Sequence, residues 1–288
     1  MASRRRQTRE TFIPLSHDPG QRAEADFGQI YVDFPDGRRE VSVLVVTWSH
    51  SYAVFAIALP SERIEAILHG LVQAFEFFGC IPRELWWDNP RTVATSILRE
   101  RQREINPKYS ALVNLCNFEP LFCMPARGNE KPHVENRVKT LKQRWATPVP
   151  CVQNLQELNE QLRSQCEAER DRTVGKRSQP IGALFDTERE QALPLPAHAF
   201  DAFIREARQV DKYQTVSIDK NRYSVPRQYA FSSVAVKGYV DRVEIIVADM
   251  MIAQHQRSYG QDEQVLDPIS SQANRQRHRL PRRRSDCA

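Results

Sequence analysis

Residues 22–59 carry three runs of mostly apolar residues whose pattern is typical of β-strands. The first two runs, AEADFGQIYVDF and EVSVLVVTW, flank Pro35, Asp36 and Gly37, a tripeptide suited to a hairpin turn. The third run, SYAVFAIAL, follows after a short polar break that begins at Ser49. The pattern therefore predicts a three-stranded meander.

A helical pattern follows at residues 61–79, where apolar side chains recur three and four positions apart. These side chains are Ile64, Ile67, Leu68, Leu71 and Phe75. Ser61 is predicted to cap the start of this helix, and Gly79 is predicted to end it.

The remaining order of elements predicts the fold class. A short strand, ELWWD, ends at Asp88, a helix is predicted at residues 107–116, the strand LFCMPA follows, and residues 131–145 have a strongly helical pattern. A meander followed by helix, strand, helix, strand and helix is the order of an RNase H-like sheet. We therefore predict an α/β core with an RNase H-like mixed sheet flanked by helices.

The character of the chain changes near residue 200, after a polar helix and a proline-rich stretch. Short β-type runs separated by turn residues then predict a small β-barrel. The predicted segments are a basic arm at 1–15, the RNase H-like core at 16–150, a helical and proline-rich linker at 151–200, the barrel at 201–260 and a basic, disordered tail at 261–288.

Composition excludes several classes of protein. The longest apolar stretches have six or seven residues, far below the roughly 18 that a membrane helix needs. No apolar segment follows the charged N-terminus, so a secretory signal is not expected. Six cysteines without a CxxC pair argue against a disulfide framework and against a zinc ribbon. We expect a reduced, cytoplasmic protein that does not contact a membrane.

The net charge of +5 at pH 7 lies at the two ends of the chain. Residues 1–10 hold four arginines and one glutamate, and residues 272–288 hold six arginines and one aspartate. Arginine-rich ends favour a polyanionic partner such as nucleic acid. From charge alone, solvated ends with no partner are equally consistent with this pattern.

Three acidic residues stand at the ends of predicted elements: Asp26 in the first strand, Asp88 after ELWW and Glu135 in the last core helix. An RNase H-like sheet would bring these positions together. Carboxylate oxygens are the ligands that Mg²⁺ prefers, and two such ions commonly serve phosphoryl transfer on DNA. Taken singly, each of these residues is more often a turn or cap residue.

The surrounding sequence closely resembles the IstA-type transposases, which are DDE recombinases of bacterial insertion sequences with an integrase-like catalytic core. The resemblance is carried by AEADFGQ, by LWWDNPRTV and by the block from NPKYSALVNLC to RGNEKPHVENRVKTLKQR. It implies that Asp26, Asp88 and Glu135 bind metal, with two Mg²⁺ or Mn²⁺ ions as cofactor. It also implies an SH3-like form for the small barrel.

The resemblance implies partners as well. These are DNA in the form of element ends and target, further copies of the chain assembled on that DNA, and a separate AAA+ helper ATPase. A bacterial cytoplasmic location, associated with the nucleoid, follows from such a role. No Walker A motif occurs, so we do not expect this chain to hydrolyse ATP.

Basic residues near these motifs are candidate DNA ligands. Those in the predicted helix around Glu135 are Lys131, Lys139, Lys142 and the arginine of the KQR triplet, Arg144, which follows Gln143. An ordinary surface Glu–Lys pair is the alternative interpretation of this helix. In the predicted barrel the candidates are Lys220, Arg222 and Arg227, interleaved with aromatic residues, although half of such side chains must face the barrel core.

The sequence also departs from the resembled family. Its members usually carry helix-turn-helix regions before the core, whereas only 25 residues precede Asp26. We therefore expect a catalytic core without the region that recognises element ends. Two alternatives remain: a truncated, non-catalytic DNA-binding derivative of a transposase, and an RNase H-like nuclease that cuts without joining.

Overall fold

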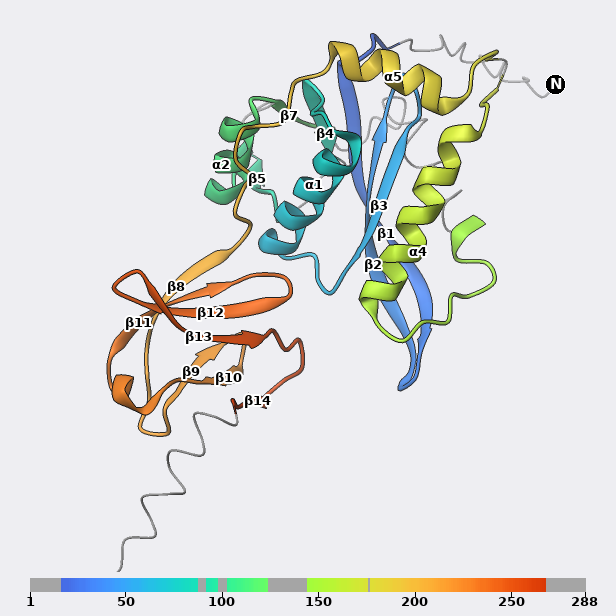
Figure 1. Cartoon of the computed structure of the whole chain (residues 1–288). Helices are drawn as coiled ribbons and strands as arrows, with labels where there is room; N and C mark the ends of the chain where they lie inside the picture. Colours follow the sequence, from blue (N-terminus) through green and yellow to red (C-terminus); the bar gives the residue numbers. More distant parts are fainter. Residues whose placement is uncertain (1–16, 88–91, 98–102, 124–143, 176, 268–288) are drawn as a thin grey trace, which may run out of the picture.

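A computed structural model describes residues 17–87, 92–97, 103–123, 144–175 and 177–267. The first part of the chain forms a mixed α/β layer built on one five-stranded sheet in the order β3-β2-β1-β4-β7 (Figure 1). Its strands are β1 (Arg22–Phe34), β2 (Gly37–Trp48), β3 (Val54–Leu59), β4 (Glu84–Trp87) and β7 (Glu119–Phe122). The predicted sheet with flanking helices is thus present.

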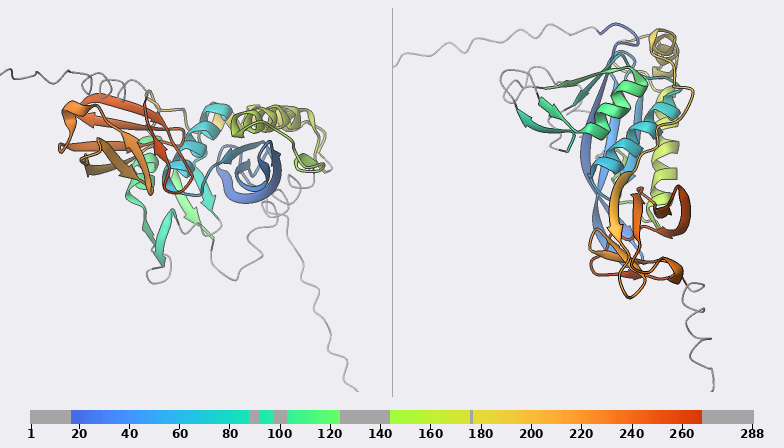
Figure 2. Two further views of the ribbon diagram at one scale, coloured as in Figure 1. Left: turned by 90° about the horizontal axis from the view of Figure 1, so that it is seen from below. Right: turned by 90° about the vertical axis from the view of Figure 1, so that its left-hand side faces the viewer.

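The central strand β1 joins two kinds of pairing. It runs antiparallel to β2, with Phe34 opposite Gly37 at the hairpin turn, and parallel to β4. The predicted meander of the first three strands is confirmed. A separate hairpin of β5 (Ala94–Ile97) and β6 (Arg103–Ile105) projects away from the sheet (Figure 2).

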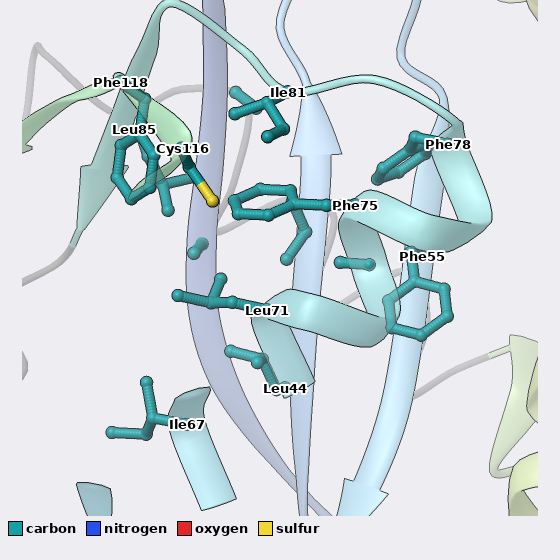
Figure 3. Packing of buried hydrophobic residues seen from close by; sticks show 14 of the residues in the cluster. Leu44, Phe55, Ile67, Leu71, Phe75, Phe78, Ile81, Leu85, Cys116 and Phe118 are labelled. Atoms are coloured by element: carbon teal, nitrogen blue, oxygen red, sulfur yellow. The ribbon is translucent and has the colours of Figure 1, made fainter. Parts of the chain in front are cut away.

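Helices cover both faces of the sheet. They are α1 (Ile64–Phe78), α2 (Pro107–Cys116), α4 (Leu155–Ala168), the short η2 (Glu169–Asp171) and α5 (Ile181–Gln191). Leu44 and Phe55 pack with Leu71 and Phe75 of α1 in one core (Figure 3). Because side chains alternate along a strand, the neighbours of Phe55, Val54 and Ala56, face the opposite core with α4.

The start of α1 differs from the prediction and its end agrees with it. The N-cap is Arg63, with no side-chain capping bond, and the hydroxyl of Ser61 is buried without a hydrogen-bond partner. At the other end Gly79 adopts a left-handed φ of 69° and donates its backbone N–H to Phe75. Such a C-cap is the usual reason for a glycine at this position.

Residues 151–200 contain α4 and α5, and both helices pack against the sheet. Leu158, Leu162 and Cys166 of α4, spaced four residues apart, are buried in the second core. The backbone of Ala58, on the edge strand β3, donates to Asn159 Oδ1 (2.7 Å) and accepts from its Nδ2 (3.1 Å). Helix α4 therefore closes a sheet edge as well as a sheet face.

The C-terminal part is a β module with a core of its own, around Val216, Tyr223, Val236 and Ile245. The elements are β8 (Ile204–Gln209), β9 (Thr215–Ile218), β10 (Asn221–Ser224), η3 (Arg227–Tyr229), β11 (Ser233–Gly238), β12 (Arg242–Val247), β13 (Met250–Gln256) and β14 (Gln264–Val265). They form a four-stranded and a three-stranded sheet.

The β module extends beyond residue 260, where the sequence predicts the start of a basic tail. Strand β14 pairs in parallel with β10, and Arg222 N–H donates to the carbonyl of Glu263 at 2.8 Å. The side chain of Asn221 accepts from the N–H of Glu263 at 3.0 Å. The segment is polar, so its sequence did not predict a strand, and β14 is held mainly by backbone hydrogen bonds.

A buried ion-pair cluster, here called the Arg257 cluster, joins the β module to α1. The side chain of Arg257 is fully buried and donates to Glu65 of α1 at 2.7 Å and to Asp219 at 2.5 Å. Asp219 also pairs with Arg63 at 2.6 Å. A buried charge is tolerated when its partners surround it, so this cluster fixes the module against the start of α1.

Among the described helices, none combines the length and the apolar composition that a bilayer crossing requires.

Replacing Glu65 with glutamine removes one negative charge from the Arg257 cluster. We expect the free energy of unfolding to fall by about 2–3 kcal/mol, because the buried guanidinium keeps fewer charged partners. Urea denaturation measures this change. Arg163→Gln, which breaks an ion pair with both side chains 58% exposed, is the control and should change stability little. Equal effects of the two variants would contradict the structural role of the cluster.

His69 of α1 gives a second test of this region. Burial lowers the pKa of His69, against the opposing influence of Asp241 and Glu76. The stability that the neutral ring contributes is present above about pH 6.5 and is lost as the pH falls through the lower folded-state pKa. Wild type should therefore lose more stability than His69→Gln between pH 7 and pH 5.5 in urea denaturation; parallel losses would refute the assignment.

Candidate functional site

Asp26 lies where the described pairing of β1 with β4 ends. The last pair of the parallel register joins Ala25 to Trp87. Asp26 and Asp88 are the next residues of the two strands in sequence. The carboxylate of Asp26 is half-buried, and its Oδ1 accepts the N–H of Phe27 at 2.8 Å. The register thus places Asp26 directly beyond the last described residue pair of the two strands.

Two charged residues that the sequence analysis did not select support this end of β1. Arg22 and Glu24 form an ion pair of 2.7 Å with side chains only 10% and 8% exposed. By strand alternation they share a face with Asp26. The hydroxyl of Ser49 on the neighbouring strand end donates to Glu24 at 3.3 Å. A charged pair inside an otherwise apolar strand was the signal that could have identified them.

The two tryptophans of β4 have different roles. Trp86 is half-buried: the Arg22 guanidinium lies 4.0 Å from its ring centroid, and its Nε1 donates to Glu84 at 2.8 Å. Trp87 is buried and donates from Nε1 to the hydroxyl of Tyr109 on α2 at 2.8 Å. The side chains of both tryptophans, the last two residues before Asp88, are therefore held by these contacts.

Tyr109 holds the Trp87 side chain through its neutral hydroxyl group. Burial raises the pKa of its hydroxyl strongly, and the hydrogen bond from Trp87 only partly offsets that effect. The neutral hydroxyl can accept from Trp87 while its ring packs edge-on against Phe118 at 6.2 Å. Helix α2 therefore fixes the last described residue of β4.

An exposed polar group connects β1, β2 and the segment that follows Asp88. Glu62 Oε1 accepts from Gln29 Nε2 at 2.8 Å and from Ser42 Oγ at 2.9 Å. Thr92 donates its hydroxyl to the carbonyl of Glu62 at 3.1 Å. These bonds hold Thr92 beside α1 and β1, a few residues along the chain from Asp88.

Most of the predicted site residues around the carboxylates lie outside the described residues. They are Asp88, Lys131, Glu135, Lys139 and Lys142. Within the ranges that the structure does describe, no group of three or more His, Cys, Asp or Glu side chains is arranged to hold a metal ion. The metal site therefore stays a prediction.

Arg144, a predicted DNA ligand at the end of this helix, is described and has a protein partner. Its Nη1 lies 2.5 Å from Glu169, whose side chain is 5% exposed, and Arg172 lies 2.9 Å from the same carboxylate. The Arg144 side chain is itself 43% exposed, and Trp145 packs against the core under α4. The two arginines and the buried carboxylate thus fix the point at which the chain returns from the region of Glu135.

The basic candidates of the β module divide between its two ends. Lys220, Arg222 and Arg227 are all exposed. Lys220 follows Asp219 of the Arg257 cluster and so lies at the end nearest α1, whereas Arg227 begins η3 after the opposite end of β10. The interleaved aromatics Tyr223 and Tyr239 are buried, as the alternation argument allowed.

Comparison with known proteins shows where the chain has relatives. Residues 195–267 match the family described as Mu transposase, C-terminal domain. A protein named transposase from Aminobacter aminovorans is 31% identical over 251 residues, covering 86% of this chain and 49% of the relative. The transposase for insertion sequences IS1326/IS1353 from Pseudomonas aeruginosa is 30% identical, with the same two shares.

The chain spans about half the length of these relatives. It is similar in sequence to insertion-sequence transposases, and this similarity covers both the sheet and the β module. The HTLV-2 integrase catalytic core domain in complex with magnesium, at 12% identity, covers 58% of this chain and 97% of its own, with a TM-score of 0.41. A TM-score this low is too weak to carry any conclusion.

Replacing Glu24 with glutamine tests the support beside Asp26. We expect a loss of about 2–3 kcal/mol in the free energy of unfolding, because Arg22 stays buried without its charged partner. Amide hydrogen exchange should also become faster at Ala25 and Trp87, where β1 and β4 pair. Arg39→Gln, which breaks the exposed pair with Asp36, is the matched control. Unchanged exchange at these amides would show that the ion pair does not support this edge.

Proposed function

We propose that this chain is the catalytic part of an insertion-sequence transposase of the IstA type, a DDE recombinase. In this proposal the five-stranded sheet is an RNase H-like core and the β module is an SH3-like barrel. The sequence similarity to transposases supports the class of protein. The assignment of the site depends on the pairing of β1 with β4. Ala25 pairs with Trp87, and Asp26 and Asp88 are the residues that follow this pair in the two segments.

The donor set fits a hard divalent cation. Asp26 offers a half-buried carboxylate on a central strand, next to the buried and charge-paired Glu24 and Arg22. We assign Asp26, Asp88 and Glu135 as ligands of Mg²⁺ or Mn²⁺, with two ions in the site. Such ions, when bound, supply Lewis-acid stabilisation of the attacking and leaving oxygens.

The proposed reaction has two phosphoryl-transfer steps. In the first, a water oxygen attacks a phosphorus at the element end, and the bond to the 3′ oxygen breaks to free a 3′-OH. In the second, this 3′ oxygen attacks a phosphorus of the target DNA, forming a new phosphodiester and releasing the target's own 3′-OH. The first step consumes one water, and neither step needs an oxidant or a nucleotide.

The residues of this chain position the DNA for both steps. Lys131, Lys139 and Lys142 would neutralise phosphates beside the carboxylates, and Arg144 would do so with the exposed part of its side chain while it stays paired with Glu169. On the β module the same role falls to Lys220, Arg222 and Arg227. Because the Arg257 cluster fixes the module on α1, these two groups of cations would engage DNA as one surface.

The proposal includes partners from the resembled family: element and target DNA, further copies of this chain on the DNA, and an AAA+ helper ATPase. It includes a bacterial cytoplasmic location at the nucleoid. The similarity to a transposase for insertion sequences supports the DNA partner.

A branched oligonucleotide that resembles a strand-transfer product tests the chemistry. We expect the wild-type chain to resolve this branch in the presence of Mg²⁺ or Mn²⁺, since resolution reverses joining and should depend little on recognition of element ends. Asp26→Asn and Glu135→Gln should each lower the rate by about a hundredfold or more, because each removes a metal ligand.

Asp33→Asn is the matched control on the same strand. Asp33 is paired with Arg38 at 2.7 Å, and both side chains reach solvent, so this variant should keep the wild-type rate. Equal rates for wild type and Glu135→Gln would exclude the three-carboxylate site. Cutting without resolution would favour the nuclease, and DNA binding without either activity would favour the non-catalytic derivative.

A further inference from the structure

Two aromatic side chains stand exposed at the end of the β module that is opposite to the Arg257 cluster. Tyr213 is 65% exposed and Phe231 is 68% exposed. Tyr213 lies in the loop before β9, and Phe231 lies between η3 and β11. Leaving two large rings in water forgoes the stabilisation that burial would provide, so their exposure calls for an explanation.

The two loops form one surface. Phe231 N–H donates to the carbonyl of Val210 at 3.1 Å, and Val210 N–H donates to the carbonyl of Ser232 at 3.0 Å. Val225 N–H donates to the carbonyl of Gln214 at 2.8 Å. Residues 210–214 and 225–232, here called the paired loops, are therefore held against each other by backbone hydrogen bonds.

The loop that carries Tyr213 is shaped by Asp211. Its Oδ1 accepts the N–H groups of Tyr213 at 2.9 Å and Thr215 at 2.8 Å, and its Oδ2 accepts the Thr215 hydroxyl at 2.8 Å. Burial raises the pKa of Asp211, but these hydrogen bonds outweigh that effect and hold its pKa below the usual value. The carboxylate is thus engaged within its own loop.

The backbone at Phe231 is held in a costly conformation. Its φ is 64°, in the left-handed region that suits glycine and is unfavourable for a bulky side chain. Gln214, on the other loop, has a φ of 62°. Such strain is commonly found at binding sites, where the surrounding structure fixes a side chain that would otherwise adopt another position.

Cations accompany the two rings. The Lys212 ammonium lies 5.0 Å from the ring centroid of Tyr213, and Arg227 is exposed on the second loop. Asp211, an acid of the first loop, accepts hydrogen bonds within its own loop, and the surface carries cations together with aromatic faces. This combination complements a polyanion with exposed π-systems, which is the chemistry of a nucleic acid with unpaired bases.

We propose that the paired loops bind unpaired DNA bases, with Tyr213 and Phe231 stacking on the bases and Lys212 and Arg227 contacting the phosphates. This inference rests on the proposed function, since it names the form of DNA that the β module recognises. It predicts that the β module binds DNA with unpaired bases, such as frayed or distorted ends, more tightly than an intact duplex. A protein partner, including a second copy of this chain, is the competing occupant.

Fluorescence anisotropy with two labelled DNAs tests the proposal on the full chain. One is a blunt duplex, and the other is the same duplex with a single-stranded overhang. Wild type should bind the overhang DNA more tightly. Phe231→Gly and Tyr213→Ala should each weaken binding to the overhang DNA by about tenfold while changing the blunt duplex little, because each removes one stacking face.

Controls separate loss of stacking from loss of folding. Phe231→Gly places glycine at a positive φ, so its thermal stability should equal or exceed that of wild type. Met250→Ala removes another exposed apolar side chain, 63% exposed on the β12–β13 hairpin, and should keep both affinities. Lys212→Ala should weaken binding to both DNAs by the same factor and reduce the salt dependence of binding.

Several results would overturn the inference. Equal affinity of wild type for the two DNAs, or unchanged overhang binding by both aromatic variants, would exclude base stacking. A wild-type dimer in sedimentation that Phe231→Gly converts to monomer would assign the loops to self-association. The branched-oligonucleotide assay tests the proposed function separately. If the chain is inactive in that assay but still binds the overhang DNA more tightly, the proposed function fails and the inference about the paired loops holds. If the chain is active but binds the two DNAs equally, only the inference about the paired loops fails.

Discussion

The parallel pairing of β1 with β4 is the contact on which the account of this protein depends. Strand β1 bonds to β2 along almost its whole length, but its described pairing with β4 covers only Arg22 to Ala25. The short pairing is reinforced by the Arg22–Glu24 ion pair on one side and by the Trp87–Tyr109 hydrogen bond on the other. Asp26 is the first residue beyond it, on a strand that the meander holds rigid.

A second constraint concerns the β module. Arg257 is separated from Glu65 by 192 residues, yet its side chain is fully buried against that carboxylate and Asp219. The module is therefore anchored to α1 through this cluster, and Tyr213 and Phe231 lie at its far end. In the proposed function, this cluster determines how the loop surface lies relative to the proposed metal site.

Local patterns predicted the elements whose side chains alternate clearly. The meander and α1 follow from apolar periodicity, and Gly79 follows from the needs of a helix end. The packing of α4 was missed because its three buried residues are spread through a mostly polar helix. Strand β14 was missed because backbone hydrogen bonds hold it, and these leave little pattern in sequence.

The candidate site could be predicted only in part. Asp26 lies directly beyond the described pairing of β1 with β4, while Asp88, Glu135 and the neighbouring lysines lie outside the described residues, so the roles of all these residues stay predictions. The Arg257 cluster was not selected, because its ion pairs join segments that are distant in sequence. Arg22 and Glu24 were not selected either, although they lie two residues apart on the same strand. A charged residue inside an apolar strand is the one local sign that sequence offers.

The most direct test of the account is anomalous X-ray diffraction from crystals of the protein soaked with Mn²⁺. We expect anomalous density at the carboxylate of Asp26, shared with Asp88, beyond the described pairing of β1 with β4. The same soak of Asp26→Asn crystals should lose that density. Manganese bound elsewhere, or the same density at residue 26 after the substitution, would contradict the assignment of this sheet edge as the metal site.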